Sequence, residues 1–61
     1  MGKIQEVTPE RAAQIARQGE PRGLFCARTA EQYIGVDTQD MDVWYRVFDS
    51  REECLAWLRR E

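Results

Sequence analysis

Two cysteines, Cys26 and Cys54, are the first candidates for chemistry in this chain, which contains no histidine. A nucleophilic cysteine or serine needs a neighbouring base, most often histidine, to activate it. A zinc site needs four ligands, usually with two cysteines close together in sequence, and this pair is widely spaced. We therefore expect no catalytic or metal-binding role for either thiol. A disulfide between the two is one alternative; we favour two reduced thiols, buried as small apolar side chains.

An acidic segment, residues 37–42, places three aspartates within six positions. Calcium binds several oxygen ligands on a tight loop, so this segment is a second candidate site. It lacks the alternating acids, central glycine and distal glutamate of an EF-hand loop. Aspartate is also frequent in turns, because its side chain bonds to nearby backbone. We expect a solvated loop, and we predict no metal ion and no cofactor.

The other polar residues do not form a catalytic group. Ser50 is best explained as a helix cap, and the adjacent Glu52 and Glu53 would diverge by about 100° on a helix instead of converging on one atom. No phosphate-binding loop or dinucleotide-binding motif is present, so no small-molecule substrate is evident. We predict that the protein is not an enzyme. A small thiol or metal-dependent enzyme is the least favoured of three functional hypotheses, after binding of a protein and binding of single-stranded nucleic acid.

Length and charge narrow the class of protein. The chain has 61 residues, of which 43% are hydrophobic and 33% charged, and this predicts one small ordered domain with a thin core. Its net charge is −2, without the clustered positive surface of a non-specific nucleic-acid binder. It has no apolar run of transmembrane length and no signal-peptide stretch, so we expect a cytoplasmic protein without a membrane partner.

The first predicted helix covers residues 9–18. Thr8 can accept a hydrogen bond from a free backbone amide at its start, and a proline follows in the first helical position. Gly19 suits a left-handed cap at its end. Its apolar face is mostly alanine, so this helix can approach its neighbour closely while burying little area.

The second predicted helix covers about residues 51–60. Ser50 and Glu53 form an S-x-x-E capping box, in which each side chain bonds to the backbone amide of the other residue. The apolar residues that follow, including Leu55 and Leu58, occupy one arc of the helix. We expect this helix to be the main core helix.

Three short apolar segments bounded by turn residues predict strands over about residues 23–28, 33–37 and 43–48. Residues 1–6 are expected to be a lead-in with one short extended piece. Gly35 predicts either a bulge or a close approach of an aromatic side chain or a helix to the backbone. Short connections suit an antiparallel meander. The predicted fold of residues 1–61 is therefore an α+β domain of order α-β-β-β-α, with a three-stranded antiparallel meander and both helices packed on one face.

The strand over 43–48 is expected to be the centre of this fold, because it holds three of the six aromatic residues. Alternate residues of a strand face opposite sides, so Trp44 and Phe48 share one face. We favour that face as core, since it buries more area. The opposite orientation would leave both aromatic side chains partly exposed.

An apolar face of the sheet should then stay open, because two short helices are expected to share the other face. Its expected residues are Tyr33, Val43, Tyr45 and Val47. Exposed apolar patches of this kind often mark interaction sites. The leading hypothesis is a non-enzymatic protein-interaction module, which binds a protein partner or forms a weak homodimer through this face.

The second hypothesis is binding of single-stranded nucleic acid. Trp44 and Tyr45, next to Arg46, could stack on bases. The aromatic residues could equally fill the core of so short a chain. The slightly acidic net charge makes nucleic acid the less expected partner.

Four segments carry a resemblance to known proteins: GLF at 23–25, YIGVD at 33–37, DVW at 42–44 with Phe48, and ECLAWL at 53–58. Over about residues 7–60 the chain resembles small bacterial and prophage-associated proteins of unknown function. The resemblance implies a stand-alone domain encoded by a mobile element, whose products often act by binding host or phage proteins. It implies no activity, cofactor or catalytic residue.

Overall fold

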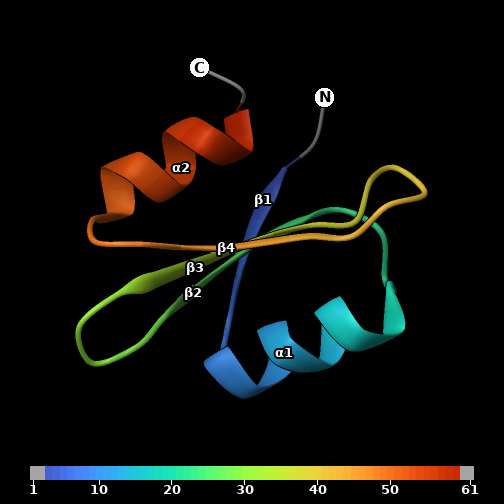
Figure 1. The fold of residues 1–61 in the computed structure, drawn as a ribbon, viewed down its shortest axis with the longest axis horizontal. Coiled ribbons are helices and arrows are strands. Elements are labelled where there is room, and N and C mark those ends of the chain that lie inside the picture. The colour runs from blue at the N-terminus through green and yellow to red at the C-terminus, as the bar shows by residue number, and fades with distance from the viewer. Residues whose placement is uncertain (1–2, 60–61) are drawn as a thin grey trace.

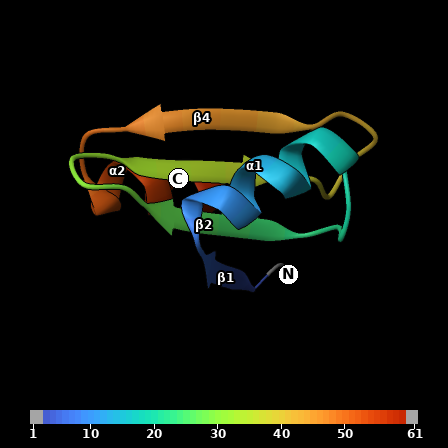
Figure 2. The same ribbon diagram turned by 90° about the horizontal axis from the view of Figure 1, so that it is seen from below.

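A computed structural model describes residues 3–59 as a four-stranded sheet with one helix on each face (Figure 1). The elements are β1 (Ile4–Val7), α1 (Pro9–Gln18), β2 (Leu24–Arg28), β3 (Tyr33–Asp37), β4 (Trp44–Phe48) and α2 (Arg51–Arg59). The strands lie in the order β1-β2-β3-β4, and Figure 2 shows this order across the sheet. β1 runs parallel to β2, and the other neighbours are antiparallel. The α+β class is therefore confirmed, whereas the three-stranded antiparallel meander is wrong.

The additional strand is β1, which lies where a lead-in was expected. It pairs with β2 from Ile4 opposite Leu24 to Val7 opposite Ala27. Parallel neighbours need a long crossover connection, and here α1 forms that connection. The strand was not predicted because it is short and lies at an edge, and Ile4 and Val7 are its only apolar residues. These two residues are three positions apart, so they do not show the period-two alternation that distinguishes a strand from a loop.

Both predicted caps of α1 are confirmed. The Thr8 hydroxyl accepts a hydrogen bond from the Arg11 backbone amide at 3.1 Å. Gly19 has a φ of 71°, and its amide donates to the Ile15 carbonyl at 2.7 Å. A left-handed residue at this position suits glycine, which has no Cβ to clash with the backbone. Ala12 and Ile15 are the buried residues of the helix.

Helix α2 begins directly after Ser50, as the capping box predicts. The Ser50 hydroxyl accepts from the Glu53 backbone amide at 3.1 Å and donates to the Glu53 carboxylate at 3.2 Å. The second bond thus joins two side chains, whereas a capping box would use the Ser50 amide. Leu58 is buried and Leu55 only half-buried. The expected helix end at residue 60 lies outside the described residues.

The two helices cover opposite faces of the sheet, so the prediction that they share one face is wrong (Figures 1 and 2). The core on the α1 side consists of Ala12, Ile15, Phe25, Ala27, Ile34 and Val36. The core on the α2 side consists of Leu24, Cys26, Cys54 and Leu58, with Ile4, Tyr33, Phe48 and Trp57 packed against it. Four consecutive residues of β2 are buried, and alternate residues face opposite sides. Each face of the central strands therefore needs its own cover.

Gly35 marks a close approach of helix α2 to the sheet. A Cβ at this position would lie 2.9 Å from Cζ3 of Trp57 and 3.2 Å from the sulfur of Cys54. Carbon atoms in ordinary contact are about 3.5–4.0 Å apart. Of the two predictions for this glycine, the close approach is confirmed: β3 pairs with both neighbours in unbroken register.

Strand β4 is an edge strand, not the centre of the fold. β2 and β3 are the central strands, and β4 pairs only with β3 among residues 3–59. Trp44 is 52% exposed, so its assignment to the core is wrong. Phe48 is half-buried and packs on Trp57, with ring centroids 5.5 Å apart. The prediction was based on the apolar area of the two aromatic side chains. Their burial depends instead on the position of β4 at the edge of the sheet, where few residues can cover them.

Neither α1 nor α2, the helices of residues 3–59, is long and apolar enough to span a membrane.

Candidate functional site

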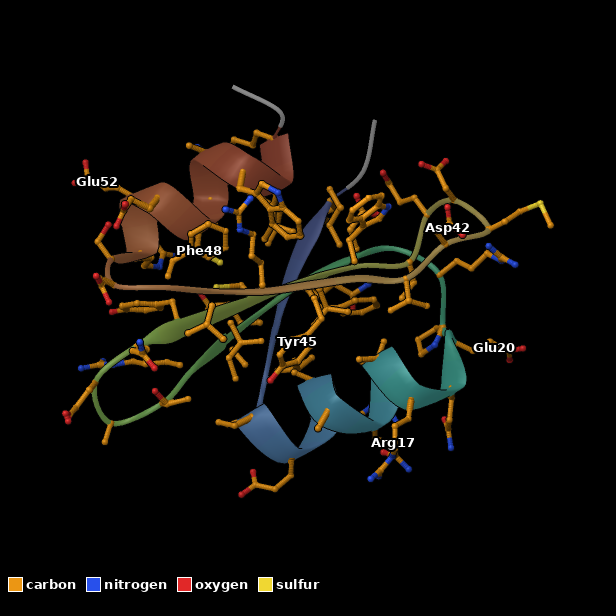
Figure 3. The ribbon with its side chains drawn as sticks, viewed as in Figure 1. Arg17, Glu20, Asp42, Tyr45, Phe48 and Glu52 are labelled. Carbon is orange, nitrogen blue, oxygen red and sulfur yellow. The ribbon has the colours of Figure 1, made fainter. Side chains whose placement is uncertain are left out.

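The side chains of β4 divide between the two faces of the sheet. Tyr45 lies opposite Val36 and Val47 opposite Ile34, which belong to the core on the α1 side. Phe48 belongs to the α2 side. Figure 3 shows Tyr45 and Phe48 pointing to opposite sides of the strand. Trp44 and Arg46 alternate with Tyr45, so they share the α2 side with Phe48.

Large apolar side chains are exposed on both faces of this strand. Tyr45 and Val47 are 47% and 44% exposed, and Val43, just before the strand, is 40% exposed. Helix α1 packs over β2 and β3, and the side chains on the α1 side of β4 stay nearly half exposed. Helix α2 covers Phe48 through Trp57 but leaves Trp44 half exposed at the other end of the strand.

The backbone of β4 is open as well. Within residues 3–59, no strand pairs with its outer edge. Amide and carbonyl groups along such an edge are available to another strand, and natural edges are usually protected by lysine, proline, a bulge or an inward-pointing charge. Residues 43–48 contain no lysine or proline, and β4 pairs with β3 in unbroken register. Their one charged side chain, Arg46, lies over the Phe48 ring with 5.9 Å between its Cζ and the centroid.

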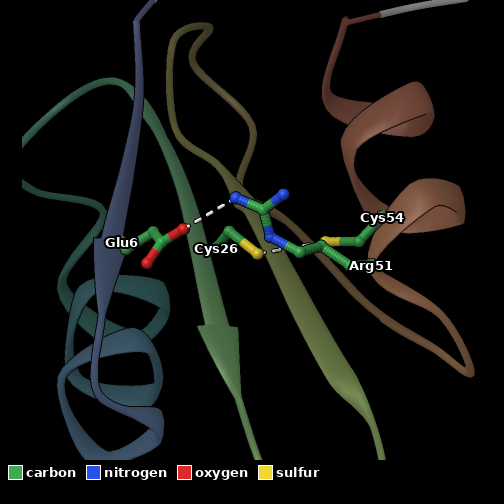
Figure 4. A network of polar contacts seen from close by, with 4 residues as sticks. All are labelled: Glu6, Cys26, Arg51 and Cys54. Atoms are coloured by element: carbon green, nitrogen blue, oxygen red, sulfur yellow. Dashed lines mark hydrogen bonds and ion pairs between the residues drawn. The ribbon is translucent and has the colours of Figure 1, made fainter.

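The opposite edge of the sheet is protected. β1 is only four residues long, and its two middle residues, Gln5 and Glu6, are polar and exposed. Arg51 of α2 reaches across to Glu6 with 2.9 Å between its guanidinium nitrogen and the carboxylate oxygen (Figure 4). The hydrogen bond and the negative charge of Glu6 raise the pKa of Arg51. A short, polar strand with an ion pair is typical of an edge that avoids a further strand.

Three of the four predicted partner-binding residues, Val43, Tyr45 and Val47, are exposed together along β4. Tyr33 is separated from them. It lies opposite Phe48 in the β3–β4 register and packs into the α2-side core, half-buried. The prediction places Tyr33 on the face opposite Phe48, whereas the register places the two residues directly opposite each other and therefore on the same face.

Trp44 and Arg46 are also exposed on β4, although the predicted partner-binding set does not include them. One signal could have identified them. The last strand of any meander lies at an edge of the sheet, so only one neighbour can cover its side chains. The predicted strand order was therefore inconsistent with a central position for residues 43–48.

The two cysteines lie together beneath the ion pair of Arg51 and Glu6 (Figure 4). Both are buried free thiols, with sulfur atoms 3.7 Å apart. Burial and the hydrogen bond to Cys26 raise the pKa of the Cys54 thiol to about 12. A thiol with such a pKa is protonated at neutral pH and is a poor nucleophile. Both side chains belong to the core between α2 and β2.

A surface cleft of about 340 Å³ adjoins Cys26. Its polar lining includes Glu6, Arg28, Tyr33 and Arg51. Glu6 already neutralises Arg51 there. Across residues 3–59, no three histidine, cysteine, aspartate or glutamate side chains gather where they could hold a metal ion.

The acidic segment is partly structural. Asp37 and Thr38 are buried, so the expectation of a wholly solvated loop is wrong for them. The Asp37 carboxylate accepts from the Gln39 amide at 3.0 Å. The Thr38 hydroxyl donates to the Pro21 carbonyl at 2.8 Å and accepts from the Gly23 amide at 2.9 Å. The two Thr38 bonds hold the β3–β4 loop against the turn before β2.

Comparison with known proteins gives no match for this chain among family models, curated proteins or solved structures. The resemblance to small bacterial and prophage-associated proteins therefore stays a prediction.

Proposed function

We propose that this protein is a non-enzymatic protein-interaction module that binds an extended segment of a partner protein along the outer edge of β4. The observation that carries the proposal is the exposed, apolar edge strand. In binding by strand addition, main-chain hydrogen bonds supply affinity, and side chains on alternate positions supply specificity.

The side chains of β4 suit this mode of binding. A partner strand beside β4 would contact Trp44 on one face of the sheet and Tyr45 with Val47 on the other. Tryptophan and tyrosine are frequent hot-spot residues in protein interfaces because they combine a large apolar area with few rotatable bonds. Arg46, already held over the Phe48 ring, adds one positive charge to an otherwise neutral strand.

The geometry favours a protein over single-stranded nucleic acid. Stacking of successive bases needs aromatic side chains that form one platform. Trp44 and Tyr45 are adjacent in a strand, so their rings lie on opposite faces of the sheet. Arg46 is the one basic residue of the strand, in a chain of net charge −2. A labelled oligonucleotide is expected not to bind even at low salt, where phosphate contacts are strongest.

The test is an affinity pull-down from the source cell with the wild-type chain, Tyr45→Glu and Met41→Glu. Met41 is 93% exposed in the loop before β4, so its variant controls for the added carboxylate. A partner that binds by strand addition should be retained by the wild type and Met41→Glu and lost with Tyr45→Glu. Equal capture by all three proteins, or oligonucleotide binding lost in Tyr45→Glu, would contradict the proposal.

A further inference from the structure

We infer that the strand accepted by β4 is β4 of a second copy, paired antiparallel about a two-fold axis through Tyr45. This inference rests on the proposed function of the β4 edge and names its partner. The result would be a continuous eight-stranded sheet, with both α1 helices on one face and both α2 helices on the other.

Symmetry restricts how two copies of this strand can pair. An antiparallel pair of identical strands in one sheet is related by a two-fold axis perpendicular to the sheet, so both α2 sides face the same way. Directly opposed residues point to the same side of a sheet. A residue of the α2 side, such as Trp44, can therefore oppose only residues that are an even number of positions away. Every permitted register places the axis through a residue and its own copy.

Charge disfavours one of these registers, and the opposed side chains favour another. An axis through Arg46 would place two guanidinium groups directly opposite each other, and opposed like charges destabilise a strand pair. An axis through Tyr45 avoids this contact. It places Trp44 of each copy opposite Arg46 of the other, and Val43 of each copy opposite Val47 of the other. Arginine over the face of tryptophan is a favourable cation–π pair.

The same register covers the exposed apolar side chains. Val43, Trp44, Tyr45 and Val47 are each between 40% and 52% exposed in the single chain. On the α1 side the pairing forms three opposed pairs: each Val43 faces Val47 of the other copy at the two ends, and the two Tyr45 side chains face each other at the centre. Aromatic and β-branched cross-strand pairs stabilise a sheet. The edge is thus complementary to itself in shape and in charge.

Two oppositely charged variants at the axis test this register. In Tyr45→Lys each lysine would face its own copy, and in Tyr45→Glu each glutamate would do the same. We expect both variants to raise the dissociation constant of the homodimer by at least about tenfold, and an equimolar mixture to restore a heterodimer through opposed lysine and glutamate. Met41→Lys, in the exposed loop, is the control and should associate as the wild type does.

Sedimentation equilibrium of each protein and of the mixture gives the readout, after far-UV circular dichroism has shown that both variants are folded. The wild-type mass should rise from one chain toward two between about 10 μM and about 1 mM, as suits a small interface. As a measurement independent of any variant, isotope-filtered NOEs in the wild type should connect the Trp44 ring of one copy to the Arg46 side chain of another.

Three results would overturn the inference: a wild-type chain that stays monomeric to about 1 mM, variants that dimerise as the wild type does, or a mixture that stays monomeric. A monomeric wild type that still captures a partner in a Tyr45-dependent manner would refute the homodimer and leave the proposed function intact. A monomeric wild type without such capture would refute both.

Discussion

Substitution of Gly35 by alanine tests the packing of α2 on the sheet. The added Cβ would lie 2.9 Å and 3.0 Å from two carbons of the Trp57 ring and 3.2 Å from the Cys54 sulfur. Ordinary carbon contacts are about 3.5–4.0 Å, so the ring must retreat by at least about 0.5 Å. Overpacking of this kind costs about 1–3 kcal/mol. Alanine also restricts the unfolded chain, which returns about 0.4–1 kcal/mol.

The net expectation is a loss of about 1–2 kcal/mol in the free energy of unfolding for Gly35→Ala. In a domain of this size, the melting temperature should fall by about 5–15 °C. Urea titrations followed by circular dichroism measure the loss, and Trp57→Leu supplies the matched background. Without the indole ring, Gly35→Ala should cost less than about half as much. An unchanged or higher stability of Gly35→Ala, or the same cost in both backgrounds, would refute this account of α2 packing.

Three further predictions concern the thiols and the α2 cap. The pKa of Cys54 is raised to about 12, above the value of about 8.5 for an unfolded cysteine, so the free energy of unfolding should fall as pH rises from about 9 to about 12. Denaturant titrations should show a smaller fall in Cys54→Ala. An equal fall in both proteins would contradict this assignment of the pKa to Cys54. Cys26 and Cys54 should resist a thiol reagent in the native protein and react with it in urea, whereas rapid native labelling would show that they are accessible. Ser50→Ala should cost about 1 kcal/mol through loss of its bond to the Glu53 amide, and an unchanged urea midpoint would show that this cap contributes nothing.

Local signals predict the elements of this fold better than their arrangement. Thr8, Gly19 and Ser50 act on backbone groups within a few residues, so the ends of α1 and the start of α2 follow from the sequence alone. The faces on which the helices pack depend on contacts distant in sequence. The decisive fact is that β1 joins the sheet parallel to β2, and its two apolar residues, Ile4 and Val7, give no periodic signal.

The candidate site was predicted only in part, because some of its features are local and others depend on contacts distant in sequence. Val43, Tyr45 and Val47 share a face by strand alternation, which is a local property. The placement of Tyr33 required the register between β3 and β4, which the six-residue loop between them does not determine. The exposure of Trp44 required the position of β4 in the sheet. In a chain this short, a large aromatic side chain is easily assigned to the core, although the thin core cannot cover every one.

Amide hydrogen exchange of β4, measured by NMR in dilute and in concentrated wild-type protein, tests the central claim most directly. In dilute protein, alternate amides of residues 44–48 should face solvent and exchange faster than the amides of β3, which pairs on both sides. In concentrated protein these same amides should become protected as a second β4 pairs with them. Protection of every β4 amide in the dilute monomer, or association that leaves the outer amides of β4 unprotected, would contradict the claim that β4 is an open edge on which a partner strand adds.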